Sequence, residues 1–417
     1  MKCQICETQT IKKTWKHCPE CGVKIEADKI NNKGYSLEHI RQGWIHKDLE
    51  NRTDKFKVIE HIGTDPFKRN VDRIRPILGE YIGIHFSNLK ILSTLSIQPR
   101  YLIELCEILR IEGKQATDYG LKALKLSSII ETYSKTEYFW KIIPKIRRNT
   151  EESWKKICQA VIEFESIQEE QGSITIQIVE GQMAYLRKKE SLNFIEKSLL
   201  EGQFEAVLDK KVIGRESTKA GRQYITLKVY PKKEKIEHKV SILDRSEYER
   251  LLDDVVEYIS CNKPSGRKIL PEVVHRAGDQ TEAYFILKAS EGHRILEKHS
   301  GVITGGKIAE RLKLEGEKQT IGYISEMFKR ERVSIITDVS FNEEGIVLKM
   351  VESAYSSGAE NANIKMDVYI AGLIEGALNQ ATKQRWEVKE MKCVAMGYQH
   401  CEFECKRISS MGNTERL

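Results

Sequence analysis

The sequence lacks several features that would place it in a familiar class. It has no apolar run near the roughly 20 residues that span a bilayer, and no apolar export segment precedes Cys3. It also lacks a phosphate loop, a GxGxxG after a strand, a GxSxG and an HExxH. The glycine-rich run at 301–306 has no following Lys-Ser/Thr, so we expect it to be a helix break. These absences favour a cytoplasmic, non-catalytic protein.

The composition is that of a globular protein of two or three domains. The chain has 417 residues, of which 40% are hydrophobic and 31% are charged. Its 68 Lys and Arg exceed its 61 Asp and Glu by seven, and a charge of +7 on this length does not by itself imply nucleic acid. Ten cysteines without an export signal indicate thiols or metal ligands in place of disulfides.

The first 27 residues contain two CxxC pairs separated by eleven residues. The predicted ligands are Cys3, Cys6, Cys18 and Cys21. This spacing predicts a zinc ribbon, in which four thiolates close a tetrahedron and the metal supplies the folding energy of a very short segment. Two redox dithiols are the alternative interpretation. A ribbon of this kind contacts a partner protein or nucleic acid, or caps a neighbouring domain.

The chain from residue 28 to residue 233 is predicted to contain a linker and one folded unit. Polar helices are expected over 28–88, followed by a strand at 89–97 and further helices to about 143. The segment from Trp154 reads as helix or as helix then strand. A strand at 173–180, a helix at 191–208 and strands at 210–217 and 222–230 complete the unit.

The C-terminal stretch shows the same order of elements. A strand at 346–352 precedes a helix at 364–381, in which Gly372 and Gly376 would let another backbone approach closely. Two strands, 386–395 and 398–406, then form a hairpin that carries three thiols. Residues 409–417 are expected to be a disordered tail.

The two units also share short sequence matches. Leu199-Leu-Glu-Gly202 matches Leu373-Ile-Glu-Gly376, and the strand at 174–180 matches 346–352. The helical segment after residue 238 echoes the one after residue 89. We therefore predict tandem domains at 89–233 and 239–408, with Ile225 at the place of Cys401 and Thr or Ser at the place of the first hairpin cysteine. The alternative is that any strand–helix–hairpin units look alike.

A family resemblance becomes visible in the hairpin. Glu390-x-x-Cys393-x-Ala395-x-Gly397-x-x-x-Cys401-x-Phe403, after a helix containing AGLIEG, resembles the C-terminal signature of the 4-vinyl reductase domain family. The resemblance implies an α+β fold with a small α/β domain, similar to the sensory domain of aromatic-responsive activators and to a subunit of the TRAPP tethering complex. Only this stretch carries the signature.

The resemblance also implies a second zinc site. Its ligands would be Asp367, Glu390, Cys393 and Cys401, although the family usually has Cys at the place of Asp367. Glu390 and Cys393 face opposite ways in a regular strand, so both can bind one metal only if the strand bulges or ends between them. His400 or Cys405 could substitute. Two other interpretations stay open: a redox pair of thiols with a pKa lowered by Lys392, and simple buried cysteines.

The leading functional hypothesis is a non-catalytic regulatory protein that binds zinc and a small apolar ligand, with the ribbon contacting a partner. A scaffold built on paired TRAPP-like domains is one alternative, and a homodimer stays open. A reductase or accessory factor of tetrapyrrole metabolism is another, which the family name implies and no flavin or nicotinamide motif supports. Transcription control through the ribbon overlaps the first hypothesis, although no helix-turn-helix is evident.

Overall fold

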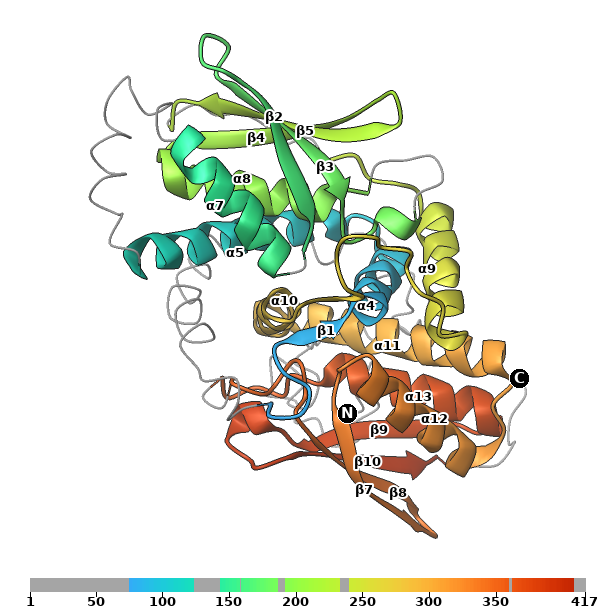
Figure 1. The fold of residues 1–417 in the computed structure, drawn as a ribbon. Helices are drawn as coiled ribbons and strands as arrows, with labels where there is room; N and C mark the ends of the chain where they lie inside the picture. Colours follow the sequence, from blue (N-terminus) through green and yellow to red (C-terminus); the bar gives the residue numbers. More distant parts are fainter. Residues whose placement is uncertain are drawn as a thin grey trace, which may run out of the picture.

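The computed structural model describes residues 75–123, 143–157, 159–186, 192–232, 240–359 and 362–408. The predicted ribbon cysteines, most of the 28–88 segment and the 409–417 tail lie outside these residues. We call 75–232 the first half and 240–408 the second half. Each half carries one four-stranded sheet, and Figure 1 shows the two sheets at opposite ends of the molecule with helices between them.

Both halves contain the predicted mixture of helices and strands. The first half consists of β1 (Tyr81–Gly83), α4 (Ile84–Ile97), α5 (Tyr101–Ala123), α7 (Ile143–Lys156), β2 (Val161–Gln168), β3 (Ser173–Glu180), η5 (Ala184–Leu186), α8 (Phe194–Leu208), β4 (Lys211–Lys219) and β5 (Arg222–Tyr230). The second half consists of α9 (Arg245–Ser260), β6 (Val273–His275), α10 (Ala277–Ala289), α11 (Glu291–Leu312), α12 (Gly316–Arg330), β7 (Ile335–Asn342), β8 (Gly345–Val351), α13 (Val368–Thr382), β9 (Trp386–Lys392), η6 (Val394–Met396) and β10 (Cys401–Arg407).

The two sheets have the same strand order and connections. The first runs β2-β3-β5-β4 and the second runs β7-β8-β10-β9, with every neighbouring pair antiparallel. In each, two hairpins are joined by one helix, α8 or α13, that lies on the sheet. The inward faces of these strands carry alternating apolar residues, which form the core beneath each helix.

Close helix pairs hold each half together, and glycines set their spacing. α11 packs along α13, where a Cβ on Gly301 or Gly305 would overlap carbonyl oxygens of α13, and a Cβ on Gly372 or Gly376 would overlap those of α11. The expected helix break at 301–306 is therefore wrong: α11 runs through these glycines, because they serve backbone approach. The first half repeats the arrangement between α5 and α8 at Gly202.

The predicted strand at 89–97 is also wrong, since this stretch forms most of α4. All fourteen residues of α4 are buried, polar ones included. A helix that is covered on every side has no amphipathic period, and a short apolar run of this kind cannot be distinguished from a strand by pattern. The expected boundary at residue 89 therefore falls inside a helix, and α4 packs mainly against α9 of the other half.

One short segment of each half crosses to the opposite half. We call residues 75–83 arm 1 and residues 267–275 arm 2. Their strands, β1 and β6, pair antiparallel, with Ile82 opposite Val274. Arm 1 donates the Leu78 N–H to Glu352 of the second half at 2.8 Å. Arm 2 donates the Leu270 N–H to Glu180 of the first half, also at 2.8 Å.

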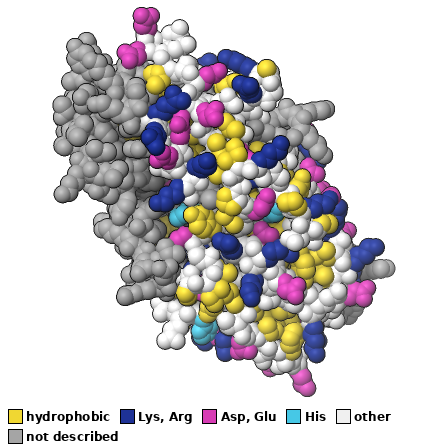
Figure 2. All heavy atoms as spheres, in the orientation of Figure 1, with side chains coloured by type: hydrophobic (Ala, Val, Ile, Leu, Met, Phe, Trp, Pro, Cys, Tyr) yellow, Lys and Arg dark blue, Asp and Glu magenta, His cyan; other side chains and the backbone are white. Residues whose placement is uncertain are grey.

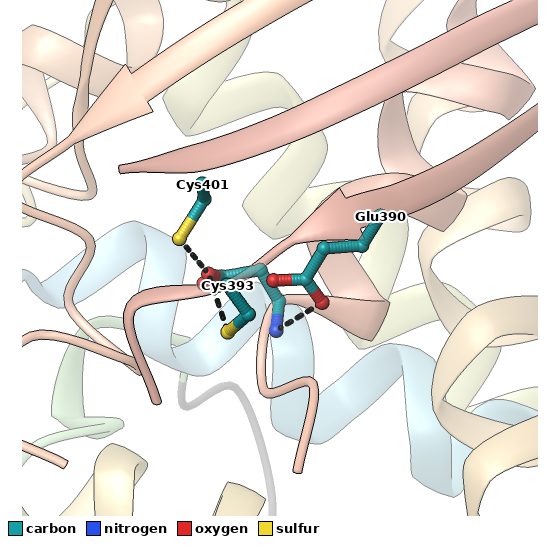
Figure 3. Close-up of side chains that lie close together, drawn as sticks. Glu390, Cys393 and Cys401 are labelled. Carbon is teal, nitrogen blue, oxygen red and sulfur yellow. Dashed lines mark hydrogen bonds between the residues drawn. The ribbon is translucent and has the colours of Figure 1, made fainter. Parts of the chain in front are cut away.

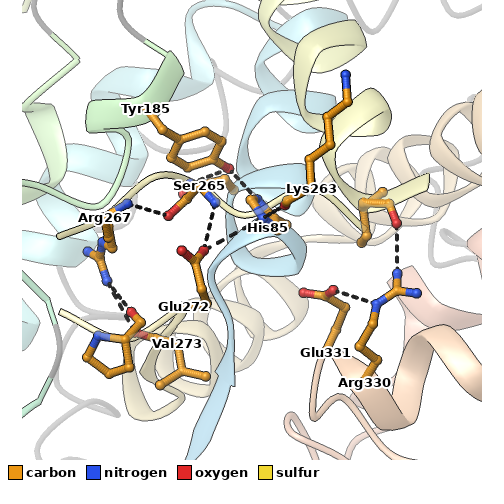
Figure 4. A network of polar contacts seen from close by, with 12 residues as sticks. His85, Tyr185, Lys263, Ser265, Arg267, Glu272, Val273, Arg330 and Glu331 are labelled. Atoms are coloured by element: carbon orange, nitrogen blue, oxygen red, sulfur yellow. Dashed lines mark hydrogen bonds and ion pairs between the residues drawn. The ribbon is translucent and has the colours of Figure 1, made fainter. Parts of the chain in front are cut away.

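An arginine in each arm anchors it to the opposite sheet. The Arg267 guanidinium donates to the Gln159 carbonyl at 3.0 Å, just before β2. The Arg75 guanidinium donates to the Arg332 carbonyl, just before β7. Figure 4 shows Arg267, Glu272 and Val273 of arm 2, and Glu272 accepts the backbone N–H of Ser265 at 2.9 Å. The contacts of the two arms are therefore reciprocal.

Charged side chains of both signs cover the visible surface. On the face in Figure 2, basic and acidic side chains are interspersed, and apolar side chains lie scattered among them. The described residues on this face form no continuous basic area of the kind that binds a nucleic-acid backbone. Among the described residues, none of the helices combines the length and apolar character needed to cross a membrane.

Candidate metal centre

Four of the predicted ligands meet at one point in the second half. They are Asp367, Glu390, Cys393 and Cys401, which we call the Asp367 cluster. One ligand atom from each lies within 4.8 Å of the others, and all four residues are buried. Figure 3 shows Glu390, Cys393 and Cys401 directed toward one another from the β9–β10 hairpin. Asp367, the residue that directly precedes α13, is the fourth member of the cluster.

A β-bulge brings Glu390 and Cys393 to the same face. In the β9–β10 ladder, Phe403 pairs with Glu390 and Glu402 pairs with Lys392, so Met391 is the extra residue. Met391 is 47% exposed, whereas Glu390 and Cys393 on either side of it are buried. This satisfies the geometric condition that the sequence set for a shared metal, because the bulge restores the parity that a spacing of three residues would break.

Asp367 is the centre of the hydrogen bonds within the cluster. Its carboxylate accepts from the Cys401 thiol at 3.0 Å and from the Ser353 hydroxyl. Its backbone N–H donates to Glu390 Oε2 at 3.2 Å. Ser356 lies 3.2 Å from Cys401 Sγ. Neither Ser353 nor Ser356 belongs to the signature, so no sequence pattern pointed to a role for them at the cluster.

Burial dominates the electrostatics of the cluster. It raises the pKa of Asp367, and together with the charge of Asp367 it raises the pKa of Glu390 well above its usual range. Hydrogen bonding between the two thiols raises the pKa of Cys401 and lowers that of Cys393. The partners described above are hydroxyls, backbone N–H groups and the cluster residues themselves, and none of these is cationic.

These donors fit a divalent metal such as zinc. Thiolate and carboxylate are both accepted zinc ligands, and a cation would supply the charge that four buried acidic groups need. Glu390 Oε1 is buried and has no hydrogen-bond partner among the described residues, which leaves one donor atom available. Zinc would act here as a structural link, because it would tie the start of α13 to the β9–β10 hairpin.

The other candidates for this site lie elsewhere. Cys405 is buried farther along β10 and does not belong to the cluster found among the described residues. His400 is partly exposed and lies 3.5 Å from Glu402. Lys392 pairs with the same Glu402 at 3.0 Å, on the solvent side of the hairpin. The expected lowering of a thiol pKa by Lys392 therefore has no geometric support.

The first half has a different set of residues at the corresponding place. Cys401 pairs with Met350, two residues before Glu352, and Gln223 pairs with Ile178, two residues before Glu180. Register therefore matches Cys401 to Gln223, so the predicted match to Ile225 is wrong by two residues.

Asn193 occupies the place of Asp367 in the first half. It precedes α8 with φ −94° and ψ 19°, close to the −95° and 32° of Asp367. Its backbone N–H donates to Glu216 at 3.2 Å, as that of Asp367 does to Glu390.

The first half supplies its own neutral and cationic partners. The Asn193 amide donates to the Gln223 amide oxygen, so two neutral groups are joined at this place. The Lys197 ammonium lies 3.7 Å from Glu216, one turn into α8. The residue one turn into α13 is Ala371. The place that holds an ammonium in the first half therefore holds a methyl group in the second.

A tight hollow lies beside the cluster, between helices of both halves. It is lined by Lys90, Ala283, Leu287, Glu297, Tyr355, Met366, Val368 and Tyr369. Lys90 is fully buried, and its ammonium lies 3.3 Å from both Glu282 and Glu297. The space is too narrow for a water molecule as the side chains stand. Its lining is mixed, since Lys90 and Glu297 lie among apolar and aromatic side chains.

Comparisons with known proteins agree with the C-terminal signature. A sequence model of the 4-vinyl reductase domain matches residues 346–407, which span β8 to β10 and contain the Asp367 cluster. No curated protein matches the chain.

Two solved structures are similar to part of this chain. One is the phenol-responsive sensory domain of the transcription activator PoxR with phenol, at 16% identity over 32% of this chain and 75% of that one, with a TM-score of 0.28. The other is a vinyl-4-reductase family protein from Methanocaldococcus jannaschii, at 18% identity over 41% of this chain and 99% of that one, also with a TM-score of 0.28.

Proposed function

We propose that this chain is a non-catalytic regulatory protein made of two copies of one domain, of which only the second holds zinc at the Asp367 cluster. The 4-vinyl reductase domain match over 346–407 supports a sensory or regulatory role for the second half. The shared strand order supports duplication. The first copy would begin with arm 1 near residue 75, before the boundary that the sequence indicated.

The observation that carries the proposal is the contrast at the two corresponding places. In the first half, Asn193 bonds to Gln223, and the Lys197 ammonium offsets the charge of Glu216, so no metal ion is needed. In the second half, two carboxyls and two thiols converge, and no described side chain supplies an ammonium to them. A buried acidic set of this kind is costly unless a cation or protons compensate it, and thiols favour zinc among the common cations.

Metal content tests the proposal directly. The purified full chain should hold two zinc ions, one in the ribbon predicted at Cys3, Cys6, Cys18 and Cys21 and one in the Asp367 cluster. The Cys393→Ser, Cys401→Ser variant should hold one. Cys405→Ser is the matched control, since it removes a buried thiol from the same strand and should leave two. A single zinc in both the wild type and the double variant would contradict the second site.

The regulatory role requires a ligand, and the hollow beside the cluster is the candidate place. Met366 and Val368 line it and flank Asp367 in the chain, so a bound molecule would press on the start of α13. Its mixed lining suits a small molecule with an apolar body and one polar group. Because the hollow is closed as the side chains stand, binding requires its lining to move apart. Phenol is a suitable probe: calorimetry on the zinc-loaded chain should detect binding that Ala283→Phe abolishes, because the larger ring would occupy the place that opens for the ligand. Unchanged binding in that variant would exclude this location.

A scaffold is the second candidate, because one observation favours it. Three large apolar side chains, Met391, Met396 and Tyr398, are each at least 40% exposed on the hairpin that carries the cluster. A scaffold that uses this hairpin would bind a protein partner whether or not phenol binds. Replacing all three with Ser should then abolish partner binding and leave metal content intact.

A further inference from the structure

One turn in the second half binds both the Asp367 cluster and arm 1. Glu352 begins this turn, and its carboxylate accepts the backbone N–H groups of Ile77 and Leu78 of arm 1. The next residue, Ser353, donates its hydroxyl to Asp367. Both Glu352 and Ser353 are buried. The arm and the cluster are therefore held by adjacent residues.

The far end of the same turn is held mainly by bonds from α10, and it touches the cluster only where Ser356 lies 3.2 Å from Cys401 Sγ. The Arg276 guanidinium donates to the carbonyls of Ala354 and Ser357 at 2.9 Å, and the Gln280 amide donates to Tyr355 at 2.9 Å. These bonds come from the start of α10 and anchor one end of the turn. The Glu352–Ser353 end is thus the part whose position the cluster can set.

In the first half a carboxylate also accepts from an arm, but no neighbouring hydroxyl connects that contact to the residue before the helix. Glu180 accepts from arm 2 as Glu352 does from arm 1. The residue that follows it is Gly181, which has no hydroxyl to reach the Asn193 position. The space does not accept a side chain either, since a Cβ on Gly181 would lie 2.8 Å from Glu196 Oε1. Arm 2 is therefore a natural control for arm 1.

We propose that metal occupancy of the Asp367 cluster controls the docking of arm 1, through Ser353 and Glu352. The inference rests on the proposed metal site. With the metal bound, Asp367 is held in place, Ser353 keeps its bond and Glu352 faces the arm. Without it, the Glu352–Ser353 end loosens and the Ile77–Leu78 part of arm 1 loses its carboxylate acceptor. Two arrangements of one turn, biased by the metal, are sufficient for such coupling.

Hydrogen–deuterium exchange on the full chain tests this, with zinc as the probe. Amide exchange in residues 75–83 and 267–275 is compared between the zinc-loaded chain and the chain treated with a strong chelator. Exchange in arm 1 should become about tenfold faster on zinc removal, within the range of common couplings. Exchange in arm 2 should change less than twofold. Equal acceleration in both arms would show general loosening and overturn the coupling.

Four variants separate the link from the site. Ser353→Ala should retain both zinc ions, yet the exchange of arm 1 should no longer respond to the metal at the cluster. Ser353→Thr keeps a hydroxyl and should restore the response. Glu352→Gln should speed exchange in arm 1 with or without zinc, whereas Glu180→Gln should do so only in arm 2.

The outcomes distinguish the coupling from the proposed function. If Cys393→Ser, Cys401→Ser lowers zinc content by one ion but arm 1 exchanges alike with and without zinc, the coupling is wrong and the metal site stands. If zinc content does not fall, both are wrong. A response of arm 1 that persists in the double cysteine variant would trace to the ribbon, and would overturn the route through Ser353.

Discussion

The two halves share one backbone arrangement but carry different side chains where the helix on each sheet begins. At the start of α8, Asn193 bonds to Gln223 and Lys197 lies near Glu216. At the start of α13, Asp367 and Glu390 meet two thiols, with no ammonium from the described residues beside them. The helix start, the backbone N–H to carboxylate bond and the strand register are shared. The fold therefore does not require the Asp367 cluster, because the first half has the same arrangement with other residues at this place.

The largest expected effect comes from breaking the cluster. Cys401→Ala should lower the free energy of unfolding of the zinc-loaded second half by about 3–5 kcal/mol, because it leaves a buried charged set without one partner. Its counterpart, Gln223→Ala, should cost only about 1–2 kcal/mol, since one buried amide loses its partner. Denaturant unfolding followed by exchange in each half measures both. Equal costs would contradict the distinction between the halves.

The next effect tests the built-in cation of the first half. Lys197→Met keeps the volume but removes the ammonium near Glu216, and should cost about 1–3 kcal/mol because Lys197 is buried. Zinc content should not change. If the variant binds an additional zinc ion, the first half has kept a latent site and the contrast with the second half is one of occupancy only.

A third prediction concerns what the halves share. Gly305→Ala would place a methyl group against the Leu373 carbonyl, and Gly202→Ala would place one against the Arg110 carbonyl. Each should cost about 1–3 kcal/mol through overpacking of a close helix pair. Gly322→Ala, at a site in α12 with open space around it, should instead stabilise by about 0.5–1 kcal/mol. Thermal unfolding of the three variants measures these signs.

The smallest effect lies on the solvent face of the β9–β10 hairpin. Lys392→Ala removes a partly exposed pair with Glu402 and should cost less than about 1 kcal/mol. Thiol reactivity of Cys393 and Cys401, measured with a thiol reagent in the metal-free chain, should not change. A marked slowing of that reaction would revive the redox interpretation.

Patterns of side-chain alternation predicted the elements near the cluster well. The hairpin strands, the helix before them and the glycine face of α13 all follow from periods of two and 3.6 residues. The sequence could indicate only that a shared metal requires a bulge between Glu390 and Cys393. Whether the bulge forms depends on the pairing with the neighbouring strand, which the pattern does not contain. The match of Ile225 to Cys401 failed by two residues, and a slip of two preserves the inward face, so alternation could not detect it.

Residue patterns along the chain did not predict the contacts between segments that are distant in sequence. The strand assigned to 89–97 failed because both halves cover α4 and remove its period. The arms were missed although they share Arg75-x-Ile-Leu-x-Glu80 and Arg267-x-Ile-Leu-x-Glu272, a repeat that a search at this spacing would find. Ser353 and Ser356 carry no motif, and only the fold places them at the cluster.

The exchange of arms has a consequence for how the protein is made. Leu78 bonds to Glu352, which lies 274 residues later in the chain. At typical rates of synthesis, roughly 15–55 s separate their translation. Throughout that interval the Leu78 end of arm 1 lacks its acceptor, while arm 2 meets a first sheet that is already complete. A ribosome that stalls before residue 273 also releases β1 without its partner β6, and such an unmatched strand is a substrate for chaperones and for unwanted pairing with a neighbouring nascent chain.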